Sequence, residues 1–304
     1  MPRWQKKTAN GLASVTVEHP KMTLEQWLQQ ASAALLPLAA QDEALTDVRL
    51  EARRLLGDVL DISPTALQIH LHDVLQPAQL SILADALKRR LTGEPLAYIT
   101  GRWWFWDLEL EVAPCTLIPR PDTELLVEQA LSLHLPASAR VLDLGTGTGA
   151  IALALAKAKP LWQLVAVDYN REAVALAQRN QQRLQLMNCQ ILQSDWFQAV
   201  KGQRFDLILS NPPDIDALDP HLQQGDVKFE PLSALVAPAA GLADLQHICQ
   251  QAPAFLNQGG WLWLEHGYQQ AEAVQQLLQE AGLVEVQSKR DYAGQWRISG
   301  GRLL

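Results

Sequence analysis

The chain has 304 residues, of which 48% are hydrophobic and 19% are charged. This length and composition suit about two folded domains and exclude a disordered chain. With 25 Lys and Arg residues against 33 Asp and Glu residues, the formal net charge is −8. That charge argues against a non-specific nucleic-acid binder, because such binding needs Lys and Arg to neutralise phosphates. No apolar run is as long as a membrane span, so a membrane protein is not expected.

The cysteines and the first residues bear on the cellular compartment. Cys115, Cys189 and Cys249 are odd in number and form no CxxC pair, as expected for reduced thiols in the cytoplasm. Residues 1–21 contain four basic side chains and one acidic side chain. No apolar segment follows them, so they do not form a secretory signal. We expect a flexible N-terminal extension over 1–21 and a cytoplasmic location.

Residues 22–95 show the periodicity of a small helical bundle. Three amphipathic stretches begin at Leu24, Val48 and Pro77. Thr23 and Gln26 have the spacing of a capping box before the first stretch. The third stretch ends in the basic trio Lys88–Arg90, which we interpret as complementing the negative end of the helix dipole; docking of an anionic partner is the alternative. We predict a helical domain over 22–95.

Residues 96–118 are predicted to form a β-hairpin that links two domains. Four consecutive aromatic residues, 103–106, precede the segment Leu108–Val112, in which apolar and acidic residues alternate with a period of two. The aromatic side chains are interpreted as packing at a junction, with a substrate-contacting surface as the alternative. Beyond this segment, Asp122 or Thr123 is expected to cap a helix.

Residues 119–304 have the pattern of a doubly wound α/β domain. Short apolar strands are expected at 141–144, 164–167, 190–192, 207–209 and 261–264. Helical stretches such as 171–183 and 270–281 alternate with them. Continuous apolar strands between helices indicate a mainly parallel sheet that is covered on both faces. The tail segments 284–288 and 296–298 are expected to form an antiparallel hairpin on one edge of that sheet.

A glycine-rich loop, Asp-Leu-Gly-Thr-Gly-Thr-Gly-Ala, follows the first of these strands. Its residues expected to bind a cofactor are Gly145, Thr146, Gly147, Thr148 and Gly149. Glycine lets the backbone turn tightly and approach a ligand. Asp168 ends the next strand, about 20 residues further on, where it is placed to accept hydrogen bonds from ribose hydroxyls. The loop therefore predicts an adenosine-containing cofactor, but a dinucleotide such as NAD fits this spacing equally well.

Asp195 and Trp196 follow the third strand. A carboxylate there can bond the adenine amino group, and an indole can pack on the adenine ring. Taken alone, such an aspartate is more often a cap or turn residue. Parallel strands bring their carboxyl ends to one edge of a sheet, so we interpret the pair as the third point of a nucleoside pocket that also includes the glycine loop and Asp168.

The fourth strand ends in Asn211-Pro212-Pro213-Asp214. Two prolines cannot continue a strand ladder, so the chain leaves the sheet here. The Asn211 amide oxygen accepts hydrogen bonds and its nitrogen donates them. Together, the Asn211 oxygen and the Pro212 carbonyl can hold both N–H bonds of a planar NH₂ group. We assign catalysis and substrate binding to these four residues, and we count Asn211 among the cofactor-binding residues as well.

These motifs resemble those of a known enzyme family. Asn-Pro-Pro after the glycine loop is similar to the class I S-adenosylmethionine-dependent amino-group methyltransferases. Further segments look like the HemK-type release-factor glutamine methyltransferases, namely Gly93–Gly101, Leu117–Glu124, Ile215–Leu222 and Phe229–Pro231. The resemblance covers residues 22–304.

The resemblance implies a Rossmann-like class I methyltransferase domain over 119–304, S-adenosylmethionine as cofactor, and a substrate-recognition role for the helical domain. It implies an enzyme that methylates the side-chain amide nitrogen of the Gln in the Gly-Gly-Gln motif of class I peptide chain release factors, which supports translation termination. We expect a monomer that does not bind nucleic acid directly. The sequence shows no nucleophilic triad and no metal-ligand cluster, and His221 and His266 are isolated and interpreted as structural.

Two positions depart from the family pattern. Asp214 stands where the family usually has Tyr, and Trp104 stands where it tends to have an acidic residue. A carboxylate at position 214 brings its hydration into a site that should be dry, so we expect reduced methyl transfer. Two alternative functions stay open. One is a catalytically weakened, cofactor-binding protein that interacts with release factors, and the other is an adenine amino-group methyltransferase acting on nucleic acid.

Overall fold

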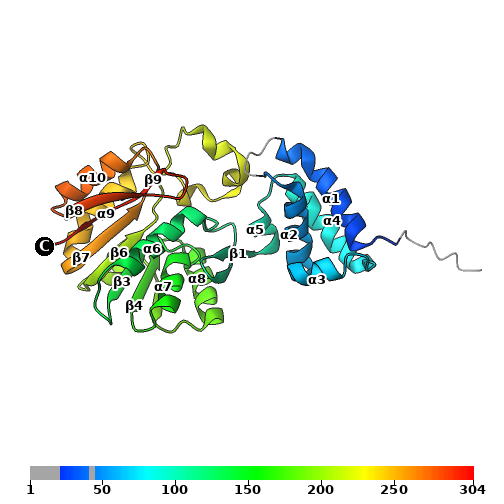
Figure 1. Cartoon of the computed structure of the whole chain (residues 1–304). Helices are drawn as coiled ribbons and strands as arrows, with labels where there is room; N and C mark the ends of the chain where they lie inside the picture. The colour runs from blue at the N-terminus through cyan, green and yellow to red at the C-terminus, as the bar shows by residue number, and fades with distance from the viewer. Residues whose placement is uncertain (1–20, 41–44) are drawn as a thin grey trace, which may run out of the picture. The chain divides into compact units, whose positions relative to one another are not determined.

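The computed structural model describes residues 21–40 and 45–304 (Figure 1). The N-terminal extension expected over 1–21 therefore lies outside the described residues, apart from Lys21. The chain divides into two compact units, the first reaching Lys88 and the second comprising Arg89–Leu304. The segment 96–118, which was predicted to be a hairpin linking two domains, falls within this second unit.

The first unit is a bundle of helices. Its elements are α1 (Leu24–Ala39), α2 (Val48–Leu60), α3 (Pro64–Ile69) and α4 (Pro77–Leu91), the last turn of which belongs to the second unit. The capping box before α1 is formed, because Thr23 and Gln26 bond each other's backbone N–H groups at 2.9 and 3.2 Å. The helices bury apolar residues that include Trp27, Leu35 and Leu55. The predicted starts of α1, α2 and α4 are confirmed, whereas α3 was missed because six residues are too few to show a helical period.

The second unit begins with the last two residues of the basic trio, Arg89 and Arg90, and continues into the hairpin. Arg89 binds the Glu94 carboxylate with Nε and Nη2, and Arg90 is 3% exposed and donates to the Glu94 carbonyl at 3.2 Å. After the short helix α5 (Leu96–Thr100), strands β1 (Arg102–Phe105) and β2 (Leu108–Glu111) pair antiparallel. The predicted hairpin is confirmed, although the aromatic run is split between environments: Phe105 is buried and Trp104 is 64% exposed.

A seven-stranded sheet forms the centre of the second unit. The strands are β3 (Arg140–Leu144), β4 (Gln163–Asp168), β5 (Cys189–Gln193), β6 (Phe205–Ser210), β7 (Leu256–Glu265), β8 (Val284–Arg290) and β9 (Trp296–Arg302). Their order is β5-β4-β3-β6-β7-β9-β8. The first five strands of this order are parallel, and β9 pairs antiparallel with both β7 and β8. The predicted mainly parallel sheet with an antiparallel tail is therefore confirmed.

Helices cover both faces of this sheet (Figure 1). They are α6 (Glu124–Ser132), α7 (Ala150–Ala158), α8 (Arg171–Leu184), α9 (Ala243–Gln251) and α10 (Ala271–Glu280). Alternate residues of β3 belong to different cores: Val141 packs with α6, α7 and α8, and Leu142 packs with α9 and α10. Successive side chains of a strand point to opposite faces, so burial on both faces explains why these strands are continuous apolar runs.

The connection into α6 differs from its prediction. A 3₁₀ turn, η1 (Pro121–Thr123), leads directly into the helix, and Thr123 makes no side-chain capping bond. Asp122 instead forms an ion pair with Arg297 at 3.2 Å. The expectation that Asp122 or Thr123 caps α6 is wrong, because both side chains have partners far away in the sequence.

Candidate active site

The four predicted motifs meet at one edge of the sheet. Leu144 at the end of β3 pairs with Val167 of β4 and with Ser210 of β6, and Asp168 pairs with Gln193 at the end of β5. The residues that follow these pairs therefore emerge side by side. Ligands of open α/β sheets bind beyond the carboxyl ends of the strands, so this edge is the candidate site.

A cavity of about 390 Å³ opens at this edge, within the usual size range of small-molecule sites. Nine predicted site residues line it, namely Gly145, Thr146, Gly147, Thr148, Asp168, Asp195, Trp196, Asn211 and Pro213. Gly149, Pro212 and Asp214 are outside the lining. The structure thus brings residues of all four motifs around one cavity, with Asn211 and Pro213 on the same lining as the glycine loop.

The glycine loop keeps its backbone open toward the cavity. Gly145 and Gly147 have φ values of +70° and +55°, which favour glycine. A Cβ at Gly145 would meet no atom within 4 Å, and one at Gly147 would meet only Thr116 at 3.9 Å. Gly149 serves packing instead, because a Cβ there would lie 2.9 Å from the Leu153 side chain of α7. Two of the three glycines therefore leave room for a ligand, and the third leaves room for the side chains of Leu153 in α7 and Ala177 in α8.

Asp168 has more partners than the sequence suggested. Its Oδ2 accepts the Gly147 N–H at 2.9 Å and its Oδ1 accepts the Asn170 N–H at 2.8 Å. Burial raises the pKa of this carboxyl group, while the two backbone donors oppose the rise. Each carboxylate oxygen can accept more than one hydrogen bond, so Asp168 can shape the glycine loop and still accept a ribose hydroxyl.

Trp196 occupies the cavity wall in an unusual backbone conformation. Its φ is +46°, and its carbonyl accepts the Ser194 hydroxyl at 2.7 Å. A bulky residue in the left-handed region carries strain that the surrounding structure must hold. The turn places both Trp196 and Asp195 on the lining of the cavity, which gives a flat apolar surface beside a carboxylate.

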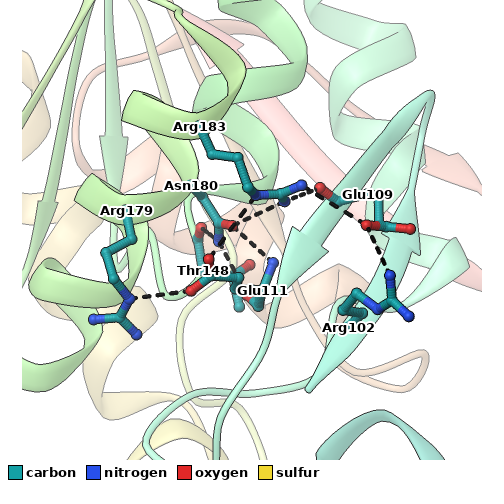
Figure 2. Close-up of polar contacts among 7 residues, drawn as sticks. All are labelled: Arg102, Glu109, Glu111, Thr148, Arg179, Asn180 and Arg183. Carbon is teal, nitrogen blue, oxygen red and sulfur yellow. Dashed lines mark hydrogen bonds and ion pairs between the residues drawn. The ribbon is translucent and has the colours of Figure 1, made fainter. Parts of the chain in front are cut away.

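The hairpin supports the glycine loop through Asn180 of α8, as Figure 2 shows. Asn180 is 0% exposed. Its Nδ2 donates to the carbonyls of Thr148 and Glu111, both at 3.0 Å, and its Oδ1 accepts the Glu111 N–H at 2.7 Å. Around it, Arg179 pairs with the Glu111 carboxylate at 3.0 Å and Arg183 donates to the Glu109 carbonyl. One buried amide thus ties β2 to the loop that borders the cavity.

Asn211 follows the last residue of β6, and its side-chain nitrogen forms a hydrogen bond within the protein. Its Nδ2 donates to the Thr123 hydroxyl oxygen at 3.1 Å. Among the described residues its Oδ1 accepts no hydrogen bond, so this oxygen is free to accept one from a ligand. The preceding Ser210 hydroxyl donates to the Leu144 carbonyl at 2.7 Å, which joins the ends of β6 and β3. Pro212 is buried.

Asp214 lies beyond the cavity lining. Its N–H and that of Ile215 donate to the Leu235 carbonyl at 3.2 and 2.9 Å, and its own carbonyl accepts from Gln270 at 2.9 Å. Burial raises the pKa of the Asp214 carboxyl to about 6, and the charge of Arg297 lowers it in part. After this point, the chain runs through the 3₁₀ turns η3 (Pro220–Gln223), η4 (Gly225–Phe229) and η5 (Leu232–Ala234).

The histidines have partners within the fold. His266 is fully buried and bonds the Ser299 hydroxyl at 2.7 Å, and His221 bonds Asp219 at 2.7 Å. In the parts of the chain that the structure describes, no group of three or more His, Cys, Asp or Glu side chains could hold a metal ion. The same parts contain no helix with the length and apolar character needed to cross a bilayer.

Sequence reasoning missed several lining residues. Thr116, Leu117 and Thr123 reach the cavity from the segment after the hairpin, and Ser233 and Asp244 reach it from segments after β6. The Leu117–Glu124 motif carried a signal for Leu117 and Thr123, since it was part of the family resemblance. Nothing local marked the second group, because only the path of the chain after β6 brings it to the cavity.

An adenosine-containing cofactor fits these residues. The open backbone at Gly145 and Gly147 admits a ligand without meeting a side chain. Carboxylates of Asp168 and Asp195 supply acceptors for hydroxyl and amino groups, and Trp196 supplies an apolar surface for a ring. These acceptors and this apolar surface are suited to the nucleoside part of S-adenosylmethionine.

Two family models and several known proteins match this chain. The model of the Methyltransferase small domain matches residues 121–224, and that of the PrmC N-terminal domain matches residues 26–101. The release factor glutamine methyltransferase of Salmonella typhimurium is 50% identical over 281 residues, covering 92% of this chain and 99% of that protein. Its counterpart from Pseudomonas aeruginosa is 58% identical over 218 residues, covering 72% and 79%.

A solved structure supports the fold. A methyltransferase from Pyrococcus furiosus superposes with a TM-score of 0.50 at 20% identity, over 72% of this chain and 98% of that one. The sheet and its flanking helices thus share the fold of that protein. Because half of the residues are identical over nearly the whole length of its relative from Salmonella typhimurium, the chain belongs to the family of release factor glutamine methyltransferases.

Proposed function

We propose that this chain transfers the methyl group of S-adenosylmethionine to the side-chain amide nitrogen of the Gln in the Gly-Gly-Gln motif of class I peptide chain release factors. The names of its relatives support this substrate. The single observation that carries the proposal is the state of Asn211, whose nitrogen is bound to Thr123 while its oxygen is left to accept, at the border of a cavity that suits the cofactor.

The cofactor is held by the glycine loop, Asp168, Asp195 and Trp196 in this proposal. When bound, S-adenosylmethionine supplies an electrophilic methyl group on a sulfonium. The chain's own part is to orient an amide nitrogen, which is a weak nucleophile because its lone pair is delocalised into the carbonyl. Fixing two reactants in line can lower a barrier by roughly 7–11 kcal/mol in well-aligned cases, so this enzyme needs no strong base.

Asn211 and Pro212 provide the orientation. The Asn211 oxygen accepts one N–H bond of the substrate amide and the Pro212 carbonyl accepts the other. Both acceptors stabilise the positive charge that develops on nitrogen, as preorganised dipoles do in other active sites. Pro213, on the cavity lining, and Asp214 complete the substrate-binding set. The proton leaves to water after methyl transfer.

The helical segment 22–95 is proposed to hold the release factor while residues 119–304 perform the transfer, with the hairpin segment 96–118 between them. One family model covers most of this helical segment, from residue 26 to 101. We also propose that the enzyme works as a monomer on protein and not on nucleic acid. The net charge of −8 supports this choice, because an adenine methyltransferase needs a basic surface for the phosphates and a pocket for a flipped base.

Methyl transfer from labelled S-adenosylmethionine tests the proposal. Purified class I release factor is expected to accept label at its Gly-Gly-Gln glutamine, and duplex or single-stranded nucleic acid is not. Asn211→Ala should reduce transfer about 10²- to 10³-fold, the scale of losing one preorganised polar contact, with cofactor affinity kept within a few-fold. Cofactor binding without any transfer would mean that the chain is a weakened, release-factor-binding relative. Label on nucleic acid would overturn the substrate assignment.

A further inference from the structure

A buried hydroxyl and a buried carboxyl group stand behind Asn211. The Thr123 hydroxyl accepts from Asn211 Nδ2 at 3.1 Å and donates to Glu265 Oε1 at 3.1 Å. Thr123 is 5% exposed and Glu265 is 6% exposed. The three residues come from η1, the end of β6 and the end of β7. Asn211 and Thr123 are 88 residues apart in the sequence, and Thr123 and Glu265 are 142 residues apart.

The direction of each hydrogen bond follows from the chemistry of these groups. A hydroxyl has one proton to donate, and its oxygen can also accept. Glu265 Oε1 receives that proton, so the Thr123 oxygen can only accept from Asn211. An amide turned by 180° would present Oδ1 to Thr123 and would compete with Glu265 for the single proton. The pair Thr123–Glu265 therefore selects the amide orientation in which Nδ2 points toward Thr123 and Oδ1 is left for a ligand.

We propose that Thr123 and Glu265 are positioning residues that lock the Asn211 side-chain amide in the one orientation able to accept a hydrogen bond from the substrate nitrogen. The inference rests on the proposed function, because it concerns the acceptor role assigned to Asn211. Neither residue is placed on the reacting atoms. Both act through Asn211, Thr123 directly and Glu265 through Thr123.

Burying Glu265 lowers the stability of the folded state, which would be hard to explain if this side chain only filled space. Its Oε2 is buried and has no hydrogen-bond partner among the described residues, and an unsatisfied buried polar atom destabilises the folded state. A methionine of similar length would pack at this position without that cost. Burial raises the pKa of Glu265 to about 8, with the charge of Asp214 adding to the rise and Thr123 and Arg297 opposing it. An ionised Glu265 can only accept, and a neutral Glu265 that carries its proton on Oε2 also leaves Oε1 as the acceptor for Thr123.

Four variants separate positioning from folding. Thr123→Val removes the hydroxyl at nearly constant volume, and Thr123→Ser restores a hydroxyl. Glu265→Met removes the acceptor, and a fourth variant combines Thr123→Val with Glu265→Met. Thr100→Val is the matched control, because its hydroxyl bonds only backbone carbonyls, those of Leu96, Ala97 and Arg102. Each purified full-length chain is tested for thermal midpoint, for S-adenosylmethionine affinity by calorimetry, and for kcat and KM on release factor.

The expected result is a selective loss of kcat. Thr123→Val and Glu265→Met should each lower kcat about 10- to 100-fold, somewhat less than removing the Asn211 side chain, with cofactor affinity changed less than about threefold. The double variant should be no slower than the slower single variant, because both act through one amide. Thr123→Ser and Thr100→Val should stay within about threefold of the wild type. Equal losses in Thr123→Val and Thr123→Ser, or additive losses in the double variant, would overturn the proposal.

A second measurement does not depend on catalysis. In free protein labelled with ¹⁵N-asparagine, the side-chain NH₂ signal of Asn211, assigned by its absence in Asn211→Ala, should exchange with water more slowly in the wild type than in Thr123→Val. Equal exchange rates in the two proteins would overturn the lock. If the wild type methylates no release factor, the proposed function fails, and the exchange measurement still decides whether Thr123 holds the amide.

Discussion

The polar network around Asn180 allows a sharp prediction about what holds the glycine loop (Figure 2). Asn180→Leu replaces a fully buried amide by an apolar side chain with the same number of heavy atoms and removes four hydrogen bonds. Three join Asn180 to backbone groups, namely the Glu111 N–H and the carbonyls of Glu111 and Thr148, and the fourth is a longer bond from Arg183 at 3.4 Å. A buried backbone group left without a partner costs about 1–3 kcal/mol. Glu111 is partly exposed, so the low end applies to its two groups. We expect a total loss of about 3–5 kcal/mol.

Differential scanning calorimetry measures this loss. For a unit of this size each kcal/mol lowers the thermal midpoint by about 2–4 °C, so Asn180→Leu should melt roughly 6–20 °C below the wild type. Since the Thr148 carbonyl is released at the border of the cavity, the affinity for S-adenosylmethionine should fall at least about threefold by calorimetric titration. The cofactor should accordingly raise the midpoint of the variant less than that of the wild type.

Arg179→Met is the matched control in the same helix. The Arg179–Glu111 ion pair spans 3.0 Å, but its side chains are 54% and 38% exposed. Exposed pairs contribute about 0–1 kcal/mol because water and salt screen them, so this variant should melt within about 4 °C of the wild type. A loss of stability in Arg179→Met as large as in Asn180→Leu, or a loss below about 1 kcal/mol in Asn180→Leu, would contradict the role assigned to Asn180.

Three further predictions concern carboxyl groups. Asp168→Ala should weaken S-adenosylmethionine binding by about 1–3 kcal/mol in calorimetry, the scale of a charge-assisted hydrogen bond, and unchanged affinity would contradict its assignment to the ribose. Asp214→Tyr should raise kcat/KM on release factor at least about tenfold, or about 1.4 kcal/mol; an unchanged or slower rate would mean that the carboxylate is adapted to its place. Because the pKa of Glu265 is raised to about 8 in the folded chain, the folded state binds its proton more tightly than the unfolded state. Stability should therefore fall between about pH 4.5 and pH 8, by up to about 5 kcal/mol. Asp214 also has a raised pKa, so the thermal midpoint of Glu265→Gln should fall less steeply with pH than that of the wild type. Parallel pH profiles for the two proteins would contradict the raised pKa of Glu265.

The strands and the motifs at their ends were predictable from the sequence. Val141 and its neighbours form apolar runs because both faces of each central strand are buried, and this pattern is local. The capping box at Thr23 and the proline that starts α4 are equally local signals. The rule that ligands bind at the carboxyl ends of parallel strands then predicts that Gly145, Asp168 and Asn211 lie at one site.

Other features required the tertiary structure. No local pattern shows that β9 inserts between β7 and β8, since strand order depends on which edges remain free after the parallel strands have paired. The six residues of α3 are too few for a period. Asp214 follows directly on Asn-Pro-Pro, yet it lies outside the cavity lining because its backbone bonds Leu235 and Gln270.

The hydrogen-bond partners of Thr123 could not be predicted from the sequence. Its sequence context, just before an amphipathic helix, is that of a capping residue, and capping needs only neighbours within four positions. In the fold, its hydroxyl is instead bonded to Asn211 and Glu265, which are 88 and 142 residues away. The sequence alone determined which side chains can donate and accept. Only the packing of β6 and β7 beside η1 decided which donor meets which acceptor, because a hydrogen bond forms within about 3 Å whatever the separation along the chain.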